Sequence, residues 1–332
     1  EMAKLVVLGG YCTQAVESIG KIWLRDNDGP MGLTRSNASV TETSKWTWFP
    51  MSGLIGNSWN KELAYEYGKA VANEGVATGV HGWYAPGANL RRNPFGGRNN
   101  EYYSEDPYLS STTAVNAIIG LQRTGTFPYL KHFALNPTEN HRNYLYNWCT
   151  EQALREIYLK PFYKAINEGG ATGVMTSYNR LGNVWTGGNT SLITGILRNE
   201  WGYNGAIITD YCDTDGVNYM NIEQALRAGG NLLLGNKSNL STSLQDSNRI
   251  QNRLKEAVHQ SLYMWLNASY ANSKYNSRDD IDEVINAKIS SSWVWWIPAV
   301  IDLDIVVGSV LISWLYLLFK KEKEKELIAN EI

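Results

Sequence analysis

Cysteine is scarce in this 332-residue chain, which contains only Cys12, Cys149 and Cys212. The three are far apart, form no Cys-x-x-Cys pair, and have no histidine at metal-ligand spacing. The sequence therefore predicts neither a disulfide framework nor a metal site. An excess of one charge is also lacking, because the formal net charge is −2 and both signs are interspersed over most of the length. Without a basic stripe to follow phosphates, we expect no nucleic-acid partner.

Two further absences concern nucleotide binding and export. No Gly-x-Gly-x-x-Gly follows a predicted strand, no Gly-x-x-x-x-Gly-Lys-Ser/Thr occurs, and Gly96-Gly97-Arg98 matches neither motif. The opening residues Glu1-Met-Ala-Lys-Leu-Val-Val7 contain no charged segment followed by an apolar one, so no signal peptide is predicted. Because the chain also lacks an initiator Met, we expect it to be part of a larger protein.

Short apolar runs alternate with helical segments through most of the chain, which is typical of βα units and a parallel sheet. The predicted strands are Lys21–Arg25, Thr78–Tyr84, Tyr129–Ala134, Gly173–Ser177, Gly205–Thr209 and Asn231–Leu234. The predicted helices are Lys61–Asn73, Leu109–Arg123, Glu151–Asn167, Leu192–Asn199, Ile222–Ala228 and Ile250–Leu266. The hydrophobic fraction of 43% is enough for one large core. We predict an α/β fold over residues 1–270.

Polar and titratable residues follow several predicted strands. Asp28, Asn89, Lys131 with His132, Tyr178 and Asp210 lie at or just after the carboxyl end of an apolar run. In a closed (β/α)8 TIM-type barrel these ends converge on one mouth, where active sites are built. An open doubly wound sheet also binds ligands at its strand ends, but usually carries a glycine fingerprint for nucleotides. The lack of such a fingerprint favours the barrel.

The C-terminal part has a different composition. A polar linker is predicted over 271–292, followed by a long apolar segment over 293–319 and a charged tail over 320–332. The apolar segment exceeds the ~20 residues needed to span a bilayer, although Asp302 and Asp304 lie within it. We predict a C-terminal hydrophobic helix that spans the cell membrane and leaves the barrel on the extracytoplasmic side. The alternative is a helix that packs on the barrel or on a partner.

Asp210 has the setting of a glycosidase nucleophile. Cleavage with retention needs one carboxylate beside the anomeric carbon and an acid about 5–5.5 Å away to protonate the leaving oxygen. Asp210 ends a fully apolar run, so its side chain is expected in the mouth of the barrel. As an alternative, Asp210 could cap the helix that follows. The 13 Trp and 20 Tyr of the chain suit sugar stacking, although core filling explains most single aromatic residues.

The residues around these positions resemble glycoside hydrolase family 3 from about Leu5 to Ala268. The motifs that carry the resemblance are Asp26-Asn-Asp-Gly-Pro-Met-Gly-Leu33, the long run Ala85 to Pro107, Lys131-His-Phe-Ala134, Met175-Thr-Ser-Tyr-Asn179 and Leu197-Arg-Asn-Glu-Trp-Gly-Tyr-Asn-Gly205 through Thr209-Asp-Tyr211. These matches are long and ordered. They imply a retaining exo-β-glycosidase of the β-glucosidase type, acting on terminal β-linked sugars without a metal or organic cofactor.

The resemblance also implies individual roles. Asp210 is the nucleophile, and Asp28 binds distal hydroxyls of the terminal sugar. The other residues implied in substrate binding are Arg98, Lys131, His132, Arg142, Met175, Tyr178 and Tyr211. Tyr178 is expected to donate to the nucleophile, and Tyr211 to offer an aromatic surface beside the sugar. We also expect the two cations and the imidazole to keep Asp210 ionised.

Two departures from the family pattern matter. The common Ser-Asp-Trp around the nucleophile is Thr209-Asp-Tyr211 here. Family 3 enzymes also usually take the general acid/base from a second, α/β domain, which these residues do not contain. We expect that domain upstream of Glu1 or on another polypeptide, with His141 near Glu139 as an alternative acid within the barrel. A non-catalytic, membrane-tethered carbohydrate-binding barrel is the alternative function.

Overall fold

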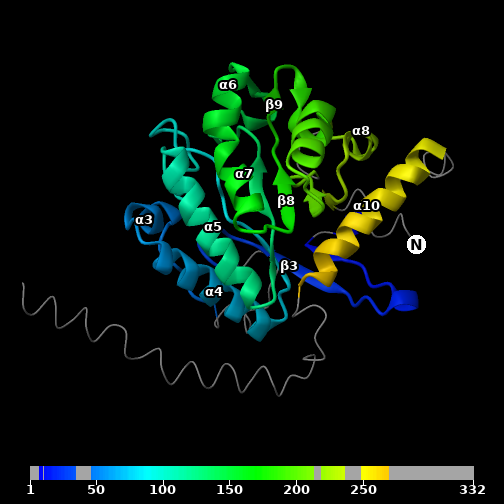
Figure 1. The fold of residues 1–332 in the computed structure, drawn as a ribbon, viewed down its shortest axis with the longest axis horizontal. Coiled ribbons are helices and arrows are strands. Elements are labelled where there is room, and N and C mark those ends of the chain that lie inside the picture. The colour runs from blue at the N-terminus through cyan, green and yellow to red at the C-terminus, as the bar shows by residue number, and fades with distance from the viewer. Residues whose placement is uncertain (1–6, 10, 35–45, 213–217, 236–247, 269–332) are drawn as a thin grey trace, which may run out of the picture. The chain divides into compact units, whose positions relative to one another are not determined.

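The computed structural model describes residues 7–9, 11–34, 46–212, 218–235 and 248–268, all of which belong to one compact unit, Glu1–Asn276 (Figure 1). Parallel strands form the centre of this unit. They are β1 (Val7–Gly9), β3 (Leu24–Asp28), β4 (Gly82–Tyr84), β5 (Phe127–Pro128), β6 (Leu130–Phe133), β8 (Gly173–Thr176), β11 (Ala206–Ile208) and β12 (Leu233–Gly235). The short strand β2 (Cys12–Thr13) is antiparallel to β3.

The strand pairing describes a ring. β3 pairs with β4 and β4 with β5, while β6 pairs with β8 and β8 with β11, all in parallel. Only Tyr129 separates β5 from β6, and a bridge from Ile208 to Leu232 connects β11 to the start of β12. β12 pairs with β1, and β2 pairs with β3. The N-terminal segment β1–β2 therefore lies between β12 and β3 in this barrel-like order.

A helix follows each strand position from β3 onward. These helices are α4 (Lys61–Thr78), α5 (Pro107–Arg123), α7 (Lys160–Asn167), the π-helix η6 (Ser191–Glu200), α8 (Ile222–Ala228) and α10 (Asn248–Leu266). Shorter helices are η1 (Glu17–Ile19), α3 (Ser52–Asn57), η3 (Arg142–Tyr144), α6 (Glu151–Ala153), η4 (Leu154–Tyr158) and η5 (Thr186–Gly188). A small sheet of β7 (Tyr146–Asn147), β9 (Arg180–Leu181) and β10 (Val184–Trp185) completes the described elements.

Within the described residues, six strand positions are each followed by a helix. At the N-terminus, β1 continues into antiparallel β2 with no long helix between them. The number of eight βα units stays a prediction. The predicted hydrophobic helix over 293–319, the linker over 271–292 and the tail over 320–332 lie outside the described residues. Among the helices that are described, none has the length and apolarity to cross a bilayer. Attachment to a membrane stays a prediction.

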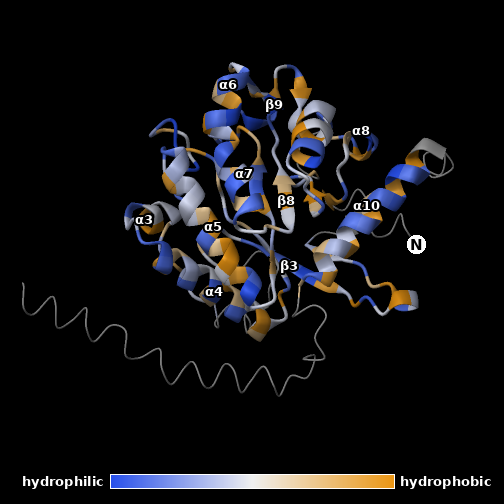
Figure 2. Cartoon of the chain, in the orientation of Figure 1, coloured by the Kyte–Doolittle hydropathy of each residue, from blue (hydrophilic) through white to orange (hydrophobic). Residues whose placement is uncertain are grey.

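Helix α4 shows how the sequence produces this arrangement. Its buried residues are Ala64, Tyr67, Gly68, Val71, Ala72 and Gly75, a spacing of three and four that places them on one face. Figure 2 accordingly shows hydrophobic and hydrophilic residues alternating along the same helix. The side chain of Asn60 accepts a hydrogen bond from the Leu63 amide and caps the first turn. At the other end, Gly79 adopts φ 73° and ends the helix.

Helices α4 and α5 lie very close together because each has a glycine at the contact. A Cβ atom at Gly68 would lie 1.9 Å from the Ala117 carbonyl oxygen, and one at Gly120 would lie 2.0 Å from the Tyr65 carbonyl oxygen. Both distances are far below any real contact. The two glycines therefore allow the backbones to touch. Asp106 and Pro107 fix the start of α5, because the Asp106 carboxylate accepts from the Leu109 amide.

Candidate active site

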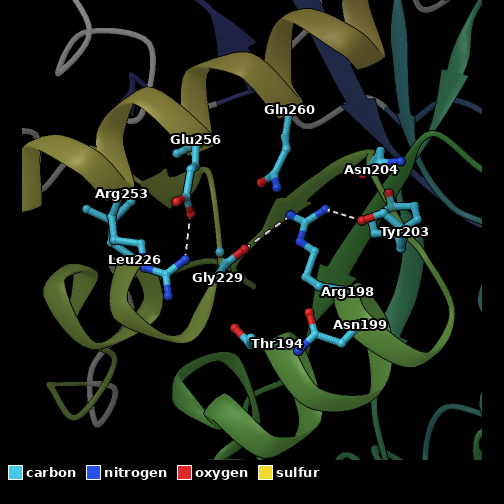
Figure 3. Close-up of a pocket in the computed structure, with 12 residues that line it drawn as sticks. Thr194, Arg198, Asn199, Tyr203, Asn204, Leu226, Gly229, Arg253, Glu256 and Gln260 are labelled. Atoms are coloured by element: carbon cyan, nitrogen blue, oxygen red, sulfur yellow. Dashed lines mark hydrogen bonds and ion pairs between the residues drawn. The ribbon is translucent and has the colours of Figure 1, made fainter.

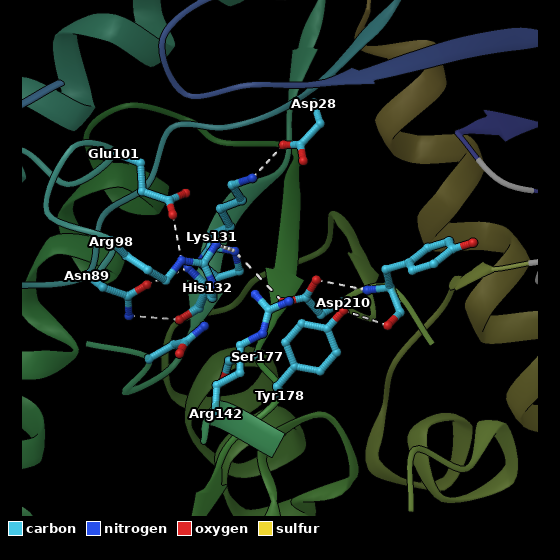
Figure 4. A network of polar contacts seen from close by, with 12 residues as sticks. Asp28, Asn89, Arg98, Glu101, Lys131, His132, Arg142, Ser177, Tyr178 and Asp210 are labelled. Carbon is cyan, nitrogen blue, oxygen red and sulfur yellow. Dashed lines mark hydrogen bonds and ion pairs between the residues drawn. The ribbon is translucent and has the colours of Figure 1, made fainter. Parts of the chain in front are cut away.

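Asp210 lies two residues after β11 and is buried, as predicted for the mouth of the barrel (Figure 4). Its Oδ1 accepts a hydrogen bond of 2.8 Å from the Tyr211 amide. Its Oδ2 has no hydrogen-bond partner among the described residues and lies 3.8 Å from His132 Nε2. Because buried acceptors are normally paired, an unpaired carboxylate oxygen indicates an atom kept available for chemistry. The fixed Oδ1 and free Oδ2 suit a nucleophile better than a helix cap.

The electrostatics of Asp210 are a balance of burial against charge. Burial raises the pKa of this carboxyl above its usual range, while the Arg98 and Arg142 guanidinium groups lower it. The Tyr211 amide and Lys131 also lower the pKa of Asp210. Burial has the larger effect on this pKa. The expectation that Asp210 is kept ionised stays a prediction. The cations limit the rise that burial would otherwise cause.

Asp28 and Lys131 bring the ends of β3 and β6 together. Lys131 Nζ donates to Asp28 Oδ1 over 2.6 Å, and Oδ1 also accepts from the Gly29 amide over 2.7 Å. The Lys131 side chain is only 4% exposed, whereas that of Asp28 is 38% exposed. Asp28 therefore keeps accessible surface for a ligand while Lys131 is held behind it. Both residues lie in the mouth, as predicted.

His132 is neutral in this environment. Burial, followed by the charges of Arg98, Lys131 and Arg142, keeps the pKa of His132 well below its usual range. Arg98 Nη2 lies 3.0 Å from Nε2. Since guanidinium can only donate, we assign Nε2 as the acceptor and place the proton on Nδ1, 3.4 Å from the Tyr102 hydroxyl. His132 therefore forms no ion pair with Asp210.

Two loop carboxylates orient the arginines of the mouth. Arg98 Nε donates to Glu101 Oε1 over 2.5 Å. Glu139 Oε2 lies 3.6 Å from Arg98 Nη1 and 3.0 Å from Arg142 Nη1, so it links the two arginines. Arg142 also lies over the Tyr178 ring, with its Cζ 4.3 Å from the ring centroid. The two arginines and the two glutamates thus form one connected network.

Tyr178 contacts the segment that carries Asp210. Its hydroxyl donates to the main-chain carbonyl of Tyr211 over 2.7 Å. The acceptor predicted from the sequence was the neighbouring residue, Asp210. The Tyr219 hydroxyl in turn donates to the Tyr178 carbonyl over 2.7 Å. Asn89 fixes the opposite wall, because its amide pairs with both the N–H and the C=O of His132. These contacts hold the two walls of the mouth by their backbones.

Comparison with known proteins decides the family. A model of the glycosyl hydrolase family 3 N terminal domain matches residues 36–263, which is more than half of the chain. The chain belongs to glycosyl hydrolase family 3.

Relatives within family 3 have more than one named activity. A β-glucosidase of Rhizobium radiobacter is 37% identical over 201 residues, which cover 60% of this chain and 24% of that protein. An exo-alpha-(1->6)-L-arabinopyranosidase of Bifidobacterium breve is 38% identical over 204 residues, which cover 60% of this chain and 27% of that protein. The chain thus spans about a quarter of the length of these curated relatives.

A solved structure supports the fold. β-Glucosidase 3B from Thermotoga neapolitana, in complex with glucose, superposes with a TM-score of 0.72 and 31% identity, covering 86% of this chain and 44% of that chain. Together with the family match, this likeness confirms the predicted TIM-type barrel as a TIM-barrel-like α/β fold.

The structure also places Met175 and the alternative acid, His141. Met175 is buried in β8 within the core cluster that contains Tyr84, Tyr129 and Ile208. His141 is exposed at φ 57°, at the start of η3. Substrate binding by Met175 and proton donation by His141 stay predictions. Tyr211 is half-buried beside Asp210, where its ring can border a ligand.

The sequence reasoning missed two residues near the mouth. Tyr11 follows β1, a strand that was not predicted although Leu5-Val-Val-Leu8 is an apolar run bounded by Gly9. Asp26 lies on β3 two residues before Asp28 and is wholly buried. The alternation of side chains along a strand could have indicated an inward position for Asp26.

Asp26 is a buried carboxyl below the mouth. Its Oδ2 accepts from the Tyr84 hydroxyl over 3.2 Å, while Oδ1 has no hydrogen-bond partner among the described residues. Burial raises the pKa of Asp26 to about 7, opposed by the Tyr84 hydrogen bond and the charge of Lys21. Burial also lowers the pKa of Lys21 to about 8. The barrel interior therefore contains two groups that titrate near neutrality.

A polar cavity of about 240 Å³ lies away from the mouth, between η6, α8 and α10 (Figure 3). Arg198 is its central side chain and donates to the carbonyls of Tyr203, Gly205 and Gly229 and to Asn231 Oδ1. Gly205 and Asn231 precede β11 and β12, so Arg198 ties the amino ends of these strands to η6. These contacts give the arginine a structural role in the family 3 barrel.

Proposed function

We propose that this family 3 barrel is the nucleophile-bearing part of a retaining exo-β-glycosidase, with terminal β-glucosides or similar sugars as substrates. The observation that carries the proposal is the buried, unpartnered Oδ2 of Asp210 beside the paired groups Asp28–Lys131 and Arg98–His132. A neutral sugar has many hydroxyls and no charge, and this mouth offers many donors around one free carboxylate oxygen.

In the proposed reaction, Asp210 Oδ2 forms a bond to the anomeric carbon while the bond from that carbon to the leaving oxygen breaks. The electron pair of the broken bond goes to the leaving oxygen. Water then loses a proton to the general acid/base and attacks the same carbon. The ester bond breaks, its electron pair returns to Asp210 as carboxylate, and the sugar leaves with retained configuration. Tyr178 supports the first step by fixing the Tyr211 carbonyl, and hence the segment that carries Asp210.

The leaving oxygen of a natural glycoside also needs a proton. Glu139 is already bound to two arginines, and His141 is exposed. We infer that the general acid/base comes from outside the described residues, which fits the much greater length of the curated relatives. A substrate whose leaving group is stable as an anion does not need this acid.

The test uses the full chain and 2,4-dinitrophenyl 2-deoxy-2-fluoro-β-glucoside. The fluorine slows hydrolysis of the glycosyl ester, so the protein should gain the mass of one fluoroglucosyl group, and peptide mapping should place it on Asp210. Saturable glucose binding without any adduct would instead support the carbohydrate-binding barrel. An adduct on another carboxylate would show that the nucleophile is assigned wrongly.

A further inference from the structure

Tyr11 has a backbone conformation that bulky residues rarely adopt. Its φ is 50°, in the left-handed region, where a non-glycine residue costs of order 1–3 kcal/mol unless its surroundings hold it there. Residues of this kind concentrate at functional sites.

The ring of Tyr11 is held between two tyrosines at the edge of the mouth. Its centroid lies 5.3 Å from that of Tyr84 below and 6.5 Å from that of Tyr211, the neighbour of Asp210. The Tyr11 carbonyl accepts from the Asp26 amide over 2.8 Å, which fixes the backbone against β3. The side chain is half-buried and packs on the same core cluster as Tyr211. Tyr11 is thus rigid and partly accessible.

The charges of both carboxylates of the site act on the Tyr11 hydroxyl. The pKa of its hydroxyl is raised to about 12 by burial, then by the charge of Asp28, by Tyr211 and by the charge of Asp210. These charge effects agree with the ring contacts that place Tyr11 beside Tyr211, the neighbour of Asp210.

The order of the strands places Tyr11 opposite the cations. The ring of strands connects Asp28 on β3 with Asp210 after β11 by two routes, which we call arcs. One arc passes β4, β6 and β8. Lys131 and His132 lie on this arc. The other arc passes from β3 through β2 and β1 to β12, and Tyr11 lies on it between β1 and β2. The mouth therefore has a cationic arc and a tyrosine arc.

A pyranose has two unlike edges that match these arcs. With the anomeric carbon at Asp210 and the far end of the ring at Asp28, one edge carries the hydroxyls of C2 and C3. The other edge contains the ring oxygen and C5, which bears a hydroxymethyl group in hexoses and only hydrogen in pentoses. The donors on the cationic arc suit the two hydroxyls. The Tyr11 ring suits the mostly apolar C5 edge.

We propose that Tyr11 contacts the C5 side of the bound sugar and favours hexopyranosides, which carry a hydroxymethyl group there, over pentopyranosides, which do not. The proposal rests on the proposed function, because it takes Asp210 and Asp28 as the two ends of the sugar pocket. Overall similarity does not decide this preference, since a β-glucosidase and an arabinopyranosidase match the chain at 37% and 38% identity.

The test measures the rate of adduct formation at Asp210 on the full chain with two inactivators. These are 2,4-dinitrophenyl 2-deoxy-2-fluoro-β-glucoside and its β-xyloside counterpart. Tyr11→Asn removes the ring, and Asn tolerates the left-handed backbone. We expect its inactivation by the glucoside to slow about tenfold and that by the xyloside less than about twofold, the size expected for one lost methylene-scale contact. Tyr11→Phe keeps the ring and should keep most of the preference for glucoside.

Trp59→Asn is the matched control, because Trp59 is also a bulky left-handed residue, with φ 55°, but is 76% exposed. It should leave both rates unchanged. Equal slowing of both reagents by Tyr11→Asn, or faster reaction with the glucoside, would overturn the proposal while leaving the nucleophile in place. Absence of any adduct on the wild-type chain would overturn the proposed function, and this inference with it.

Discussion

The Tyr178 hydroxyl and the Tyr211 carbonyl are joined by a hydrogen bond of 2.7 Å that fixes the residue next to Asp210. Removing the hydroxyl with Tyr178→Phe should slow inactivation by an activated fluoroglucoside about threefold to tenfold, since one hydrogen bond contributes about 0.5–1.5 kcal/mol. Tyr103→Phe is the matched control, because the buried Tyr103 hydroxyl has no hydrogen-bond partner among the described residues. Equal effects of the two variants would indicate a general loss of stability.

Replacing Asp210 tests the nucleophile directly. Asp210→Gly should lower turnover of 2,4-dinitrophenyl β-glucoside by at least about a thousandfold, because the covalent route is lost. Azide fits the space that the carboxylate leaves and should restore release of dinitrophenol, with an α-glucosyl azide as the product. Nuclear magnetic resonance of the product reads the configuration at the anomeric carbon. A β-azide would contradict the assignment.

The ion pair of Asp28 and Lys131 predicts that substitutions of the two residues have non-additive effects on the free energy of sugar binding. Asp28→Asn and Lys131→Met should each raise the dissociation constant for glucose, measured by calorimetry, by about tenfold or more, because a bond to a charged group contributes about 1.5–3 kcal/mol. The double variant should be weakened by clearly less than the product of the two effects, because the residues act through one contact of 2.6 Å. Fully multiplicative effects would show that the two bind the sugar independently.

The proposed origin of the acid can be tested by varying the leaving group. If no described residue protonates the leaving oxygen, the full chain should cleave 2,4-dinitrophenyl β-glucoside while phenyl β-glucoside reacts at least about a thousandfold more slowly, as expected without general acid assistance. His141→Ala should not change either rate. Similar rates on the two substrates, or loss of the phenyl reaction alone in His141→Ala, would place the acid within the barrel.

Asp26 predicts an unusual dependence of stability on pH. Its pKa is about 7 in the folded chain, so between its unfolded value near 4 and pH 7 the folded state binds more protons and becomes less stable as the pH rises. Asp26→Asn removes this loss and should increase the free energy of unfolding by roughly 2–4 kcal/mol at pH 8, where the shift acts in full. Urea unfolding should show the advantage shrinking toward zero near pH 4. An advantage that is equal at both pH values would show that packing, and not ionisation, is responsible.

The parts of the fold that the sequence predicted were those with strong local patterns. Six strands and six helices followed from apolar runs and helical periodicity. Among the described residues, Asp28, Lys131, Tyr178 and Asp210 lie at or after four of these strands and meet in one mouth. β1 was missed although the run Leu5-Val-Val-Leu8 offered an apolar signal, and β2, with two residues, carries too little pattern to detect. The sequence therefore did not predict that this segment closes the ring of strands, nor where Tyr11 lies.

The pKa values and protonation states of the site residues were harder to predict from the sequence than which residues lie in the site. The sequence shows that cations accompany Asp210, but not how deeply the carboxylate is buried, and burial decides the direction of its pKa shift. The tautomer of His132 likewise depends on the position of Arg98 relative to Nε2, which only the folded chain defines. Motif and spacing predict which residues meet, whereas distances and burial decide how they behave.

Gly68 and Gly120 are two helix positions that should stay unchanged when this chain is engineered. The two helices they join follow β3 and β4, so a methyl group added on the outside of the barrel would spread the strands that position Asp28 and Asn89. Surface libraries that treat these helices as freely mutable will lose activity at positions far from any ligand. A redesign that keeps both glycines and varies their exposed neighbours should retain the geometry of the mouth while changing solubility.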